Sequence, residues 1–94
     1  MKHVNGPALF PMGRLVMTKG VMEAISADET LVAIIRHSQG DWGDVCDEDR
    51  LSNEEALVQS YRLFSVYTAM DETKFWIITE HDRSYTTILL PNEY

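Results

Sequence analysis

Apolar residues in the first half of the chain recur at the spacing of a helix. Leu31, Ile34 and Ile35 are three and four positions apart, which predicts one buried helical stripe. The preceding residues 26–29, Ser-Ala-Asp-Glu, have the spacing of a capping box, in which serine and glutamate each bond the other's backbone amide. Gly40 is suited to ending this helix. We therefore expect a helix that begins after Ser26 and ends before Gly40.

Two further helices are predicted on weaker patterns. A short one is expected over residues 19–25, although it contains a glycine. Residues 52–55, Ser-Asn-Glu-Glu, form a second capping box and predict a helix over residues 53–60. Leu57 and Tyr61 would lie on its inner face. A helix this short needs tertiary packing for its stability.

The second half of the chain alternates β-prone runs with short polar turns. The runs cover residues 63–69, 75–80 and 85–90 and are rich in aromatic and β-branched side chains. Turns of about four residues make neighbouring strands antiparallel, which predicts a three-stranded meander. Two or three N-terminal helices would pack on one face of this sheet, and residues 14–18 are a candidate for an added edge strand. The predicted fold class is α+β.

Length and composition favour one domain, 1–94, with an irregular N-terminal arm over residues 1–13. An apolar fraction of 45% argues against disorder. The longest apolar run, residues 31–35, is far shorter than a membrane span. The first residues lack the pattern of a signal peptide, and the single cysteine excludes an internal disulfide, so a cytoplasmic protein is expected.

The acidic charge is concentrated in one part of the chain. The net charge is −7, and residues 23–55 hold ten acids and two arginines, a balance of −8. Such a segment repels nucleic acid and attracts basic protein surfaces. The eight Lys and Arg residues form no basic stripe, which also disfavours direct nucleic-acid binding. A face that only keeps the protein soluble would have the same composition.

The most unusual stretch is residues 37–53, HSQGDWGDVCDEDRLSN, which has no regular apolar period and is interpreted as a connection. Its candidate binding residues are Asp41, Trp42, Asp44, Asp47, Glu48 and Asp49. Trp42 lies between two glycines, and two interpretations stay open. It either fills the core, which a small domain favours, or forms an exposed interface anchor with an acidic rim.

Metal and catalytic patterns are weak in this stretch. A calcium loop of the EF-hand type fails, because counting from Asp47 puts Leu51 at position five and counting from Asp44 puts Cys46 at position three. The closely spaced ligand pairs of zinc sites are missing from the sequence. Neighbouring acids would raise the thiol pKa of Cys46, so we interpret it as a small side chain packed beside Val45. No metal, cofactor or catalytic residue is assigned.

One constellation supports an alternative interpretation as a polar pocket. It requires the loop over residues 37–50 to meet the turn over residues 80–84. The pocket would then contain His37, Asp41, Glu80, Asp82 and Arg83. Paired carboxylates can perform acid–base chemistry when their environments differ. Ordinary turn chemistry also explains the last three residues, with Asp82 accepting backbone bonds and Arg83 pairing with an acid.

Four stretches together carry a family resemblance: RHSQGDWGDV, DRLSNEEAL, RLFSVY and FWIITEHDRSYTTILLPNEY. Over residues 14–94 the chain resembles a family of small bacterial proteins, some labelled plasmid-related, that are found near mobile elements. The resemblance implies a setting in bacterial genomes, plasmids or phages. It supplies no catalytic residue and no cofactor.

The leading hypothesis is a small acidic interaction module that binds a basic protein surface. It could inhibit a host nucleic-acid-handling or defence protein, with the acids over residues 41–55 standing in for phosphates. The alternative is a small enzyme or ligand-binding domain built on the polar pocket. A homodimer formed through an unpaired strand edge, near Leu15 or near Leu63, is a third hypothesis.

Overall fold

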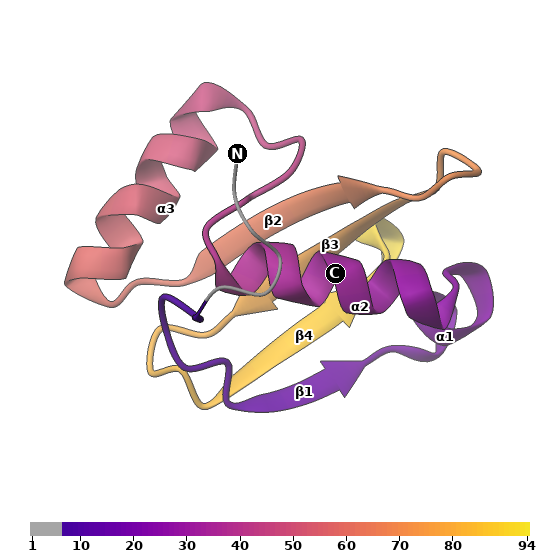
Figure 1. Ribbon diagram of the computed structural model, residues 1–94, viewed down its shortest axis with the longest axis horizontal. Helices are drawn as coiled ribbons and strands as arrows, with labels where there is room; N and C mark the ends of the chain where they lie inside the picture. The colour runs from indigo at the N-terminus through magenta and orange to yellow at the C-terminus, as the bar shows by residue number, and fades with distance from the viewer. Residues whose placement is uncertain (1–6) are drawn as a thin grey trace.

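A computed structural model describes residues 7–94 of the protein (Figure 1). The elements in chain order are β1 (Arg14–Met17), α1 (Lys19–Ala24), α2 (Ala27–Ser38), α3 (Asp47–Gln59), β2 (Leu63–Thr68), β3 (Lys74–Thr79), β4 (Tyr85–Leu89) and the 3-10 helix η1 (Pro91–Glu93). Residues 7–13 precede β1 without regular structure, and residues 1–6 of the predicted arm lie outside the described part. Within residues 7–94 no helix has the length and apolar character needed to cross a bilayer.

The sheet has the strand order β1-β4-β3-β2. The antiparallel meander of β2, β3 and β4 is confirmed, with strand bounds close to the predicted ones. The candidate N-terminal edge strand also forms, since β1 joins the sheet, and its parallel pairing with β4 means that the sheet is not purely antiparallel. Parallel pairing needs a long crossover, and the chain between β1 and β4 supplies one. The α+β class is confirmed, and the sheet is mixed and four-stranded.

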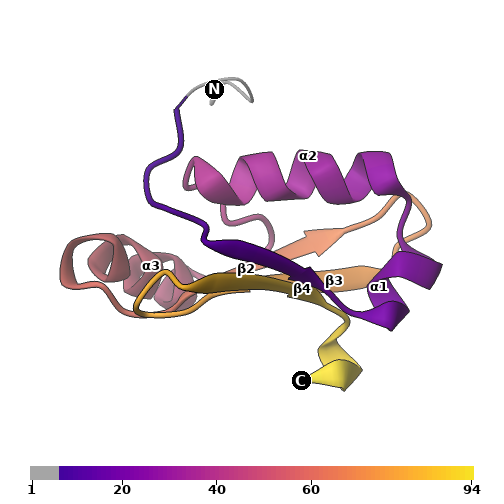
Figure 2. The same cartoon turned by 90° about the horizontal axis from the view of Figure 1, so that it is seen from below.

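The two faces of the sheet have different cover. In Figure 2, α2 lies across one face, while η1 and the C-terminus lie on the other side. The core on the α2 side packs α1 and α2 against the strands. Its buried residues are Val21, Ile25, Ala33, Tyr67, Ala69, Phe75, Ile77 and Ile88. Of the two or three helices expected on one face of the sheet, α3 is not one that covers it, because α3 lies beside β2 (Figure 1).

The predicted buried stripe of α2 is rotated in the structure. Leu31 is exposed, and Ile34 and Ile35 are only half-buried. The buried positions are Thr30, Ala33 and His37. Small and hydrogen-bonding side chains on this line allow a close approach of the helix to the sheet. The Ser26 hydroxyl accepts from the Glu29 amide as predicted, but the Glu29 carboxylate accepts from the Met70 amide, so the capping box is only half formed.

α3 begins at Asp47, six residues before the predicted start, and Ser52 lies inside it, so the second capping box is wrong. Three acids in its first turn explain the early start, because carboxylates stabilise the positive end of the helix dipole. The inward line is formed by Asn53 and Ala56, with Leu57 half-buried and the predicted Tyr61 exposed. A helix that is polar on nearly every side carries no apolar period for sequence reasoning to detect.

Candidate functional site

The segment between α2 and α3 runs along the outer edge of β2. The Val66 amide donates to the Trp42 carbonyl at 3.1 Å, and the Asp44 amide donates to the Val66 carbonyl at 2.7 Å. Gly43 forms a parallel bridge with Val66. These two hydrogen bonds satisfy the backbone groups that an edge strand otherwise exposes. The loop therefore closes this edge of the sheet.

Gly43 is required at this close approach. Its φ is +73°, and a Cβ at this position would lie 1.9 Å from the Val66 carbonyl oxygen. A side chain would suffer both from the left-handed backbone and from the collision with β2. Gly43 therefore allows the loop to lie close against β2.

Asn53 satisfies the backbone groups of Phe64, the next outward-facing residue of β2. Its side-chain amide donates to the Phe64 carbonyl at 2.7 Å, and its carbonyl oxygen accepts from the Phe64 amide at 3.0 Å. The side chain is buried and imitates the backbone of a neighbouring strand. Residues 42–53 thus cap β2 at both Phe64 and Val66, and we call them the edge cover.

Trp42 fills the core. It is 3% exposed, stacks on Phe10 with ring centroids 6.3 Å apart and meets His37 edge-on at 5.6 Å. Its indole Nε1 donates to a Glu54 carboxylate oxygen at 2.9 Å. Of the two interpretations, the core plug is confirmed, and the exposed anchor is wrong because no face of the ring reaches solvent.

His37 is the centre of a buried chain of hydroxyl groups. Nδ1 contacts the Ser65 hydroxyl, and Nε2 lies 2.9 Å from the Thr79 hydroxyl. Thr79 in turn lies 2.7 Å from the Thr86 hydroxyl, which donates to the Met12 carbonyl at 2.6 Å. This series of hydrogen bonds thus links β2, α2, β3, β4 and the N-terminal segment.

The chain of hydroxyl groups determines which nitrogen of His37 carries the proton. Each hydroxyl has one hydrogen, and Thr86 spends its own on a carbonyl, so Thr79 must donate to Thr86. Thr79 can then only accept from His37, which places the proton on Nε2 and leaves Nδ1 to accept from Ser65. Burial, and secondarily the charge of Arg83, lowers the pKa of His37 to about 3. The imidazole is therefore neutral and structural.

His37 is fully buried, so it cannot line a pocket that is open to solvent. Cys46, by contrast, is exposed at the N-cap of α3, so its predicted packing as an apolar side chain beside Val45 is wrong. A buried neutral imidazole whose two nitrogens are both engaged cannot take a proton from an exposed thiol. Cys46 and His37 therefore do not form a pair of nucleophile and general base.

Asp41, Glu80 and Asp82 are held by separate contacts and do not converge. Asp41 forms a bidentate pair with Arg36 at 2.8 and 3.2 Å. Glu80 lies 3.4 Å from Arg62 and lines the same surface as Glu93 of η1. Asp82 accepts from both the amide and the hydroxyl of Ser84 at 3.0 and 2.6 Å, which confirms its predicted turn role. These contacts give no support to a shared polar pocket.

Arg83 ties the β3–β4 turn to the end of α3. Its guanidinium donates to the carbonyls of Ala56 at 2.9 Å and Tyr61 at 2.6 Å. It also lies 5.6 Å from the Phe10 ring. A cation at the C-terminus of a helix satisfies its free carbonyls and the negative end of its dipole. The expectation that Arg83 pairs with an acid is therefore wrong, and its role is to hold α3.

The predicted acidic residues divide into two groups. Asp41 is paired with Arg36, and Asp44 accepts from the Thr68 hydroxyl at 2.7 Å and lies 3.7 Å from Lys74. Each of these two loop acids therefore has a basic neighbour. The acids of α3 have fewer partners, since Asp47 has only an exposed pair with Arg50 at 3.5 Å, and no hydrogen bond or ion pair joins Glu48 or Asp49 to another side chain in the described part of the chain.

The outer side of α3 combines these acids with exposed apolar side chains, which sequence reasoning missed. Leu51 is 60% exposed and Val58 is 79% exposed, and their spacing of seven residues places them on one side of the helix. Glu48 and Glu55 lie on the same side, three residues before Leu51 and four after it, and both are exposed. We call these four residues the α3 face.

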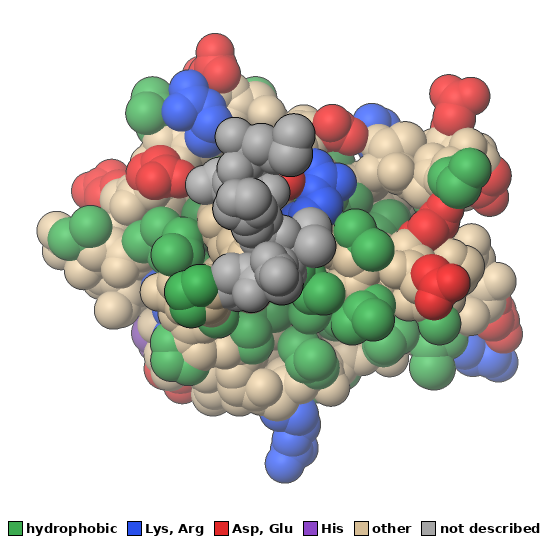
Figure 3. All heavy atoms as spheres, viewed as in Figure 1, with side chains coloured by type: hydrophobic (Ala, Val, Ile, Leu, Met, Phe, Trp, Pro, Cys, Tyr) green, Lys and Arg blue, Asp and Glu red, His purple; other side chains and the backbone are tan. Residues whose placement is uncertain are grey.

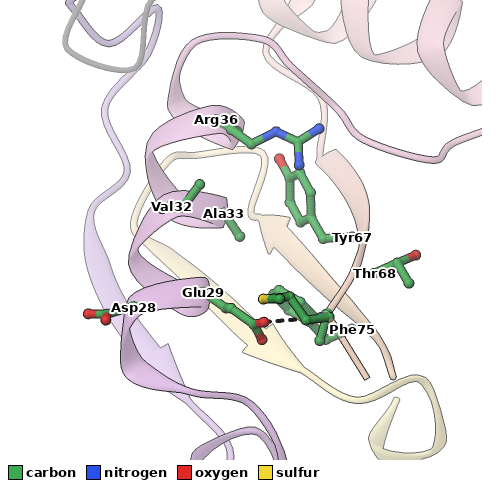
Figure 4. A pocket seen from close by; sticks show the side chains of 10 residues that line it. Asp28, Glu29, Val32, Ala33, Arg36, Tyr67, Thr68 and Phe75 are labelled. Carbon is green, nitrogen blue, oxygen red and sulfur yellow. Dashed lines mark hydrogen bonds between the residues drawn. The ribbon is translucent and has the colours of Figure 1, made fainter. Parts of the chain in front are cut away.

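The cleft between α2 and the β2–β3 hairpin, about 250 Å³ in volume, is drawn in Figure 4. Glu29 and Arg36 stand at its two ends, and Phe75 and Ala33 form apolar walls. Glu29 is bonded to the Met70 amide and Arg36 to Asp41, so these two charged groups already have partners. Among residues 7–94, no three His, Cys, Asp or Glu side chains are grouped closely enough to hold a metal ion.

Comparisons of the chain with protein-family models, with curated proteins and with solved structures give no significant match.

Proposed function

We propose that the protein is a small interaction module that binds a basic protein surface through the α3 face. The observation that carries this proposal is the exposure of Leu51 and Val58 beside Glu48 and Glu55, which have no counter-ion within residues 7–94. Interfaces commonly combine a desolvated apolar centre with a charged rim. The α3 face has this composition, with the apolar role moved from Trp42 to Leu51 and Val58.

The negative charge of α3 indicates which class of partner it would bind. α3 carries five acids and one arginine, a balance of −4 over its 13 residues. Such a helix attracts a positively charged partner and raises the rate of encounter at low salt. Because Asp41 lies beside Arg36 and Asp44 lies beside Lys74, the helix acids supply most of this field. The proposed binding surface is therefore narrower than residues 41–55.

The partner class follows from charge and from the resemblance to mobile-element proteins. A bacterial nucleic-acid-handling or defence protein presents a basic groove of the sign that α3 requires. Carboxylates along one helix would stand in for phosphates in such a groove. Binding would then block the groove and inhibit the partner.

The test is an affinity capture from bacterial lysate at low and high salt, followed by binding measurements with the purified partner. We expect Glu48→Lys/Glu55→Lys to weaken binding by more than about tenfold and to reduce its salt dependence. Leu51→Gln/Val58→Gln should weaken binding with the salt dependence unchanged. Glu23→Lys/Glu72→Lys carries the same charge change on other surfaces and serves as the matched control. Equal losses in the control and in the α3 variants would exclude the α3 face.

A further inference from the structure

The two edge strands of the sheet, β2 and β1, differ in whether their outward backbone groups are covered. The edge cover closes β2, whereas no strand of residues 7–94 pairs with the outer side of β1. Arg14 and Thr18 donate their amides to the carbonyls of Ser84 and Ile88 in β4, at 3.1 and 3.0 Å. Backbone groups alternate in direction along a strand, so those of Leu15 and Met17 point away from the sheet. Two amides and two carbonyls therefore stand open at this edge.

Apolar side chains surround the open edge. Leu15 is 50% exposed and Met17 is 41% exposed, and both lie on the α2 side, because their register partners in β4 are buried there. Met17 continues into a groove of about 350 Å³ that it shares with the exposed Met22 and Leu31. Figure 3 shows hydrophobic side chains gathered over the region between α2 and β1. An apolar patch beside an unpaired strand is a typical site of strand addition.

The geometry points to a second copy of this chain as the occupant of the β1 edge, paired antiparallel across a two-fold axis. The outward groups of Leu15 and Met17 are symmetric about Val16. A two-fold axis at Val16 therefore sets Leu15 opposite Met17 of the second copy, and Met17 opposite its Leu15. Each of these two pairs makes two backbone hydrogen bonds, and apolar side chains meet on the α2 side.

The same register brings opposite charges together on the other face of the sheet. Arg14, which has no ion pair within residues 7–94, would lie opposite Thr18 of the second copy. The Thr18 hydroxyl donates to the Glu93 carboxylate at 2.6 Å, so a negative charge is already fixed beside this position. The Gly20 amide holds the other Glu93 oxygen at 3.2 Å. An arginine facing a fixed carboxylate is a specific contact that an unrelated strand would not reproduce.

Four hydrogen bonds alone do not hold two proteins together, since stable interfaces bury about 800 Å² on each partner. The apolar groove and the two Arg14–Glu93 contacts supply the remaining contact. An isologous dimer uses the same patch twice, which requires a self-complementary surface. The β1 edge meets this requirement in its backbone, apolar and charged groups, and it does not involve the α3 face.

The test is the mass of the full chain in solution, measured by light scattering and sedimentation from low micromolar to submillimolar concentration. The wild type should be dimeric at the upper end. Met17→Pro removes an outward amide without touching the β4 ladder and should raise the dissociation constant by about tenfold or more. Leu15→Lys, which sets a charge against the second copy, should also separate the dimer. Hydrogen exchange at the Leu15 and Met17 amides should slow as the dimer forms.

Leu51→Lys, on the α3 face, is the control and should leave the dimer intact. Circular dichroism identifies any variant that fails to fold, and Leu15→Lys decides the matter if Met17→Pro does not fold. A monomer at every concentration would overturn the proposal, including the case in which the edge accepts a strand of another protein. A dimer that persists in both edge variants, or that is lost in Leu51→Lys, would also overturn it.

Discussion

Acidification should destabilise this protein through His37 well before its carboxylates are protonated. The imidazole is buried among the hydroxyls of Ser65 and Thr79, with Nδ1 accepting and Nε2 donating. A second proton on Nδ1 would remove its role as acceptor and leave a charge in the core. The folded state therefore resists protonation, whereas the unfolded chain takes up the proton freely.

The sign and size of the effect follow from the two pKa values of His37. The folded value is about 3 and the unfolded value is 6.5. The unfolded state thus binds more protons between these limits, so stability is fully present above pH 6.5 and falls as the pH decreases toward 3. Each pH unit costs about 1.4 kcal/mol, which gives a loss of about 2 kcal/mol between pH 7 and pH 5. Small domains have only about 5–15 kcal/mol in total.

Urea unfolding measured at several pH values between 7 and 5 checks this prediction. The wild type should lose stability steadily over this window, and His37→Gln should start less stable but vary little with pH. His81→Gln, a change at an exposed histidine in the β3–β4 turn, should keep the wild-type slope. The carboxyl pKa values that the fold lowers, those of Asp71, Asp82 and Glu93, act at lower pH. Equal slopes for the wild type and His37→Gln would refute the buried neutral imidazole.

Three substitutions test the edge cover by chemical denaturation. Gly43→Ala should cost more than about 3 kcal/mol, because its Cβ collides with the Val66 carbonyl and the backbone is left-handed; a cost below 1 kcal/mol would contradict the close approach. Asn53→Ala should cost about 2–4 kcal/mol, since both backbone groups of Phe64 lose their partner; a neutral result would mean that water replaces the amide. Trp42→Phe keeps the ring packing and should cost only about 1 kcal/mol, for the lost indole hydrogen bond.

The elements with strong local signals could be predicted from the sequence. Ser26 caps α2, Thr18 caps α1, and the three runs of β-branched and aromatic residues became the meander. These features depend on neighbours a few residues apart. Local chemistry alone therefore defines them, and the structure places their ends within a residue or two of expectation.

The features that failed depend on contacts between distant residues. His37 belongs to the core only because Ser65 and Thr79, far along the chain, supply two hydroxyls in the right places. Asn53 is buried because it bonds the backbone of Phe64, and the neighbouring residues in the sequence do not predict this contact. The start of α3 was missed for a related reason, since its inward side uses Asn53 and Ala56 in place of a large apolar stripe.

The stretch that looks most like a binding loop has mainly a structural task, and this changes where function should be sought. Residues 42–53 use their glycine, tryptophan and asparagine to close the β2 edge, and α3, which begins within this stretch at Asp47, carries the solvent-facing acids. The open edge, β1, lies at the opposite end of the sheet. A dimer through β1 would therefore place its two α3 faces at the far ends of a continuous sheet. Such a molecule presents two separated acidic surfaces, and two linked weak contacts can hold a repetitive or two-fold symmetric basic partner more tightly than either contact alone.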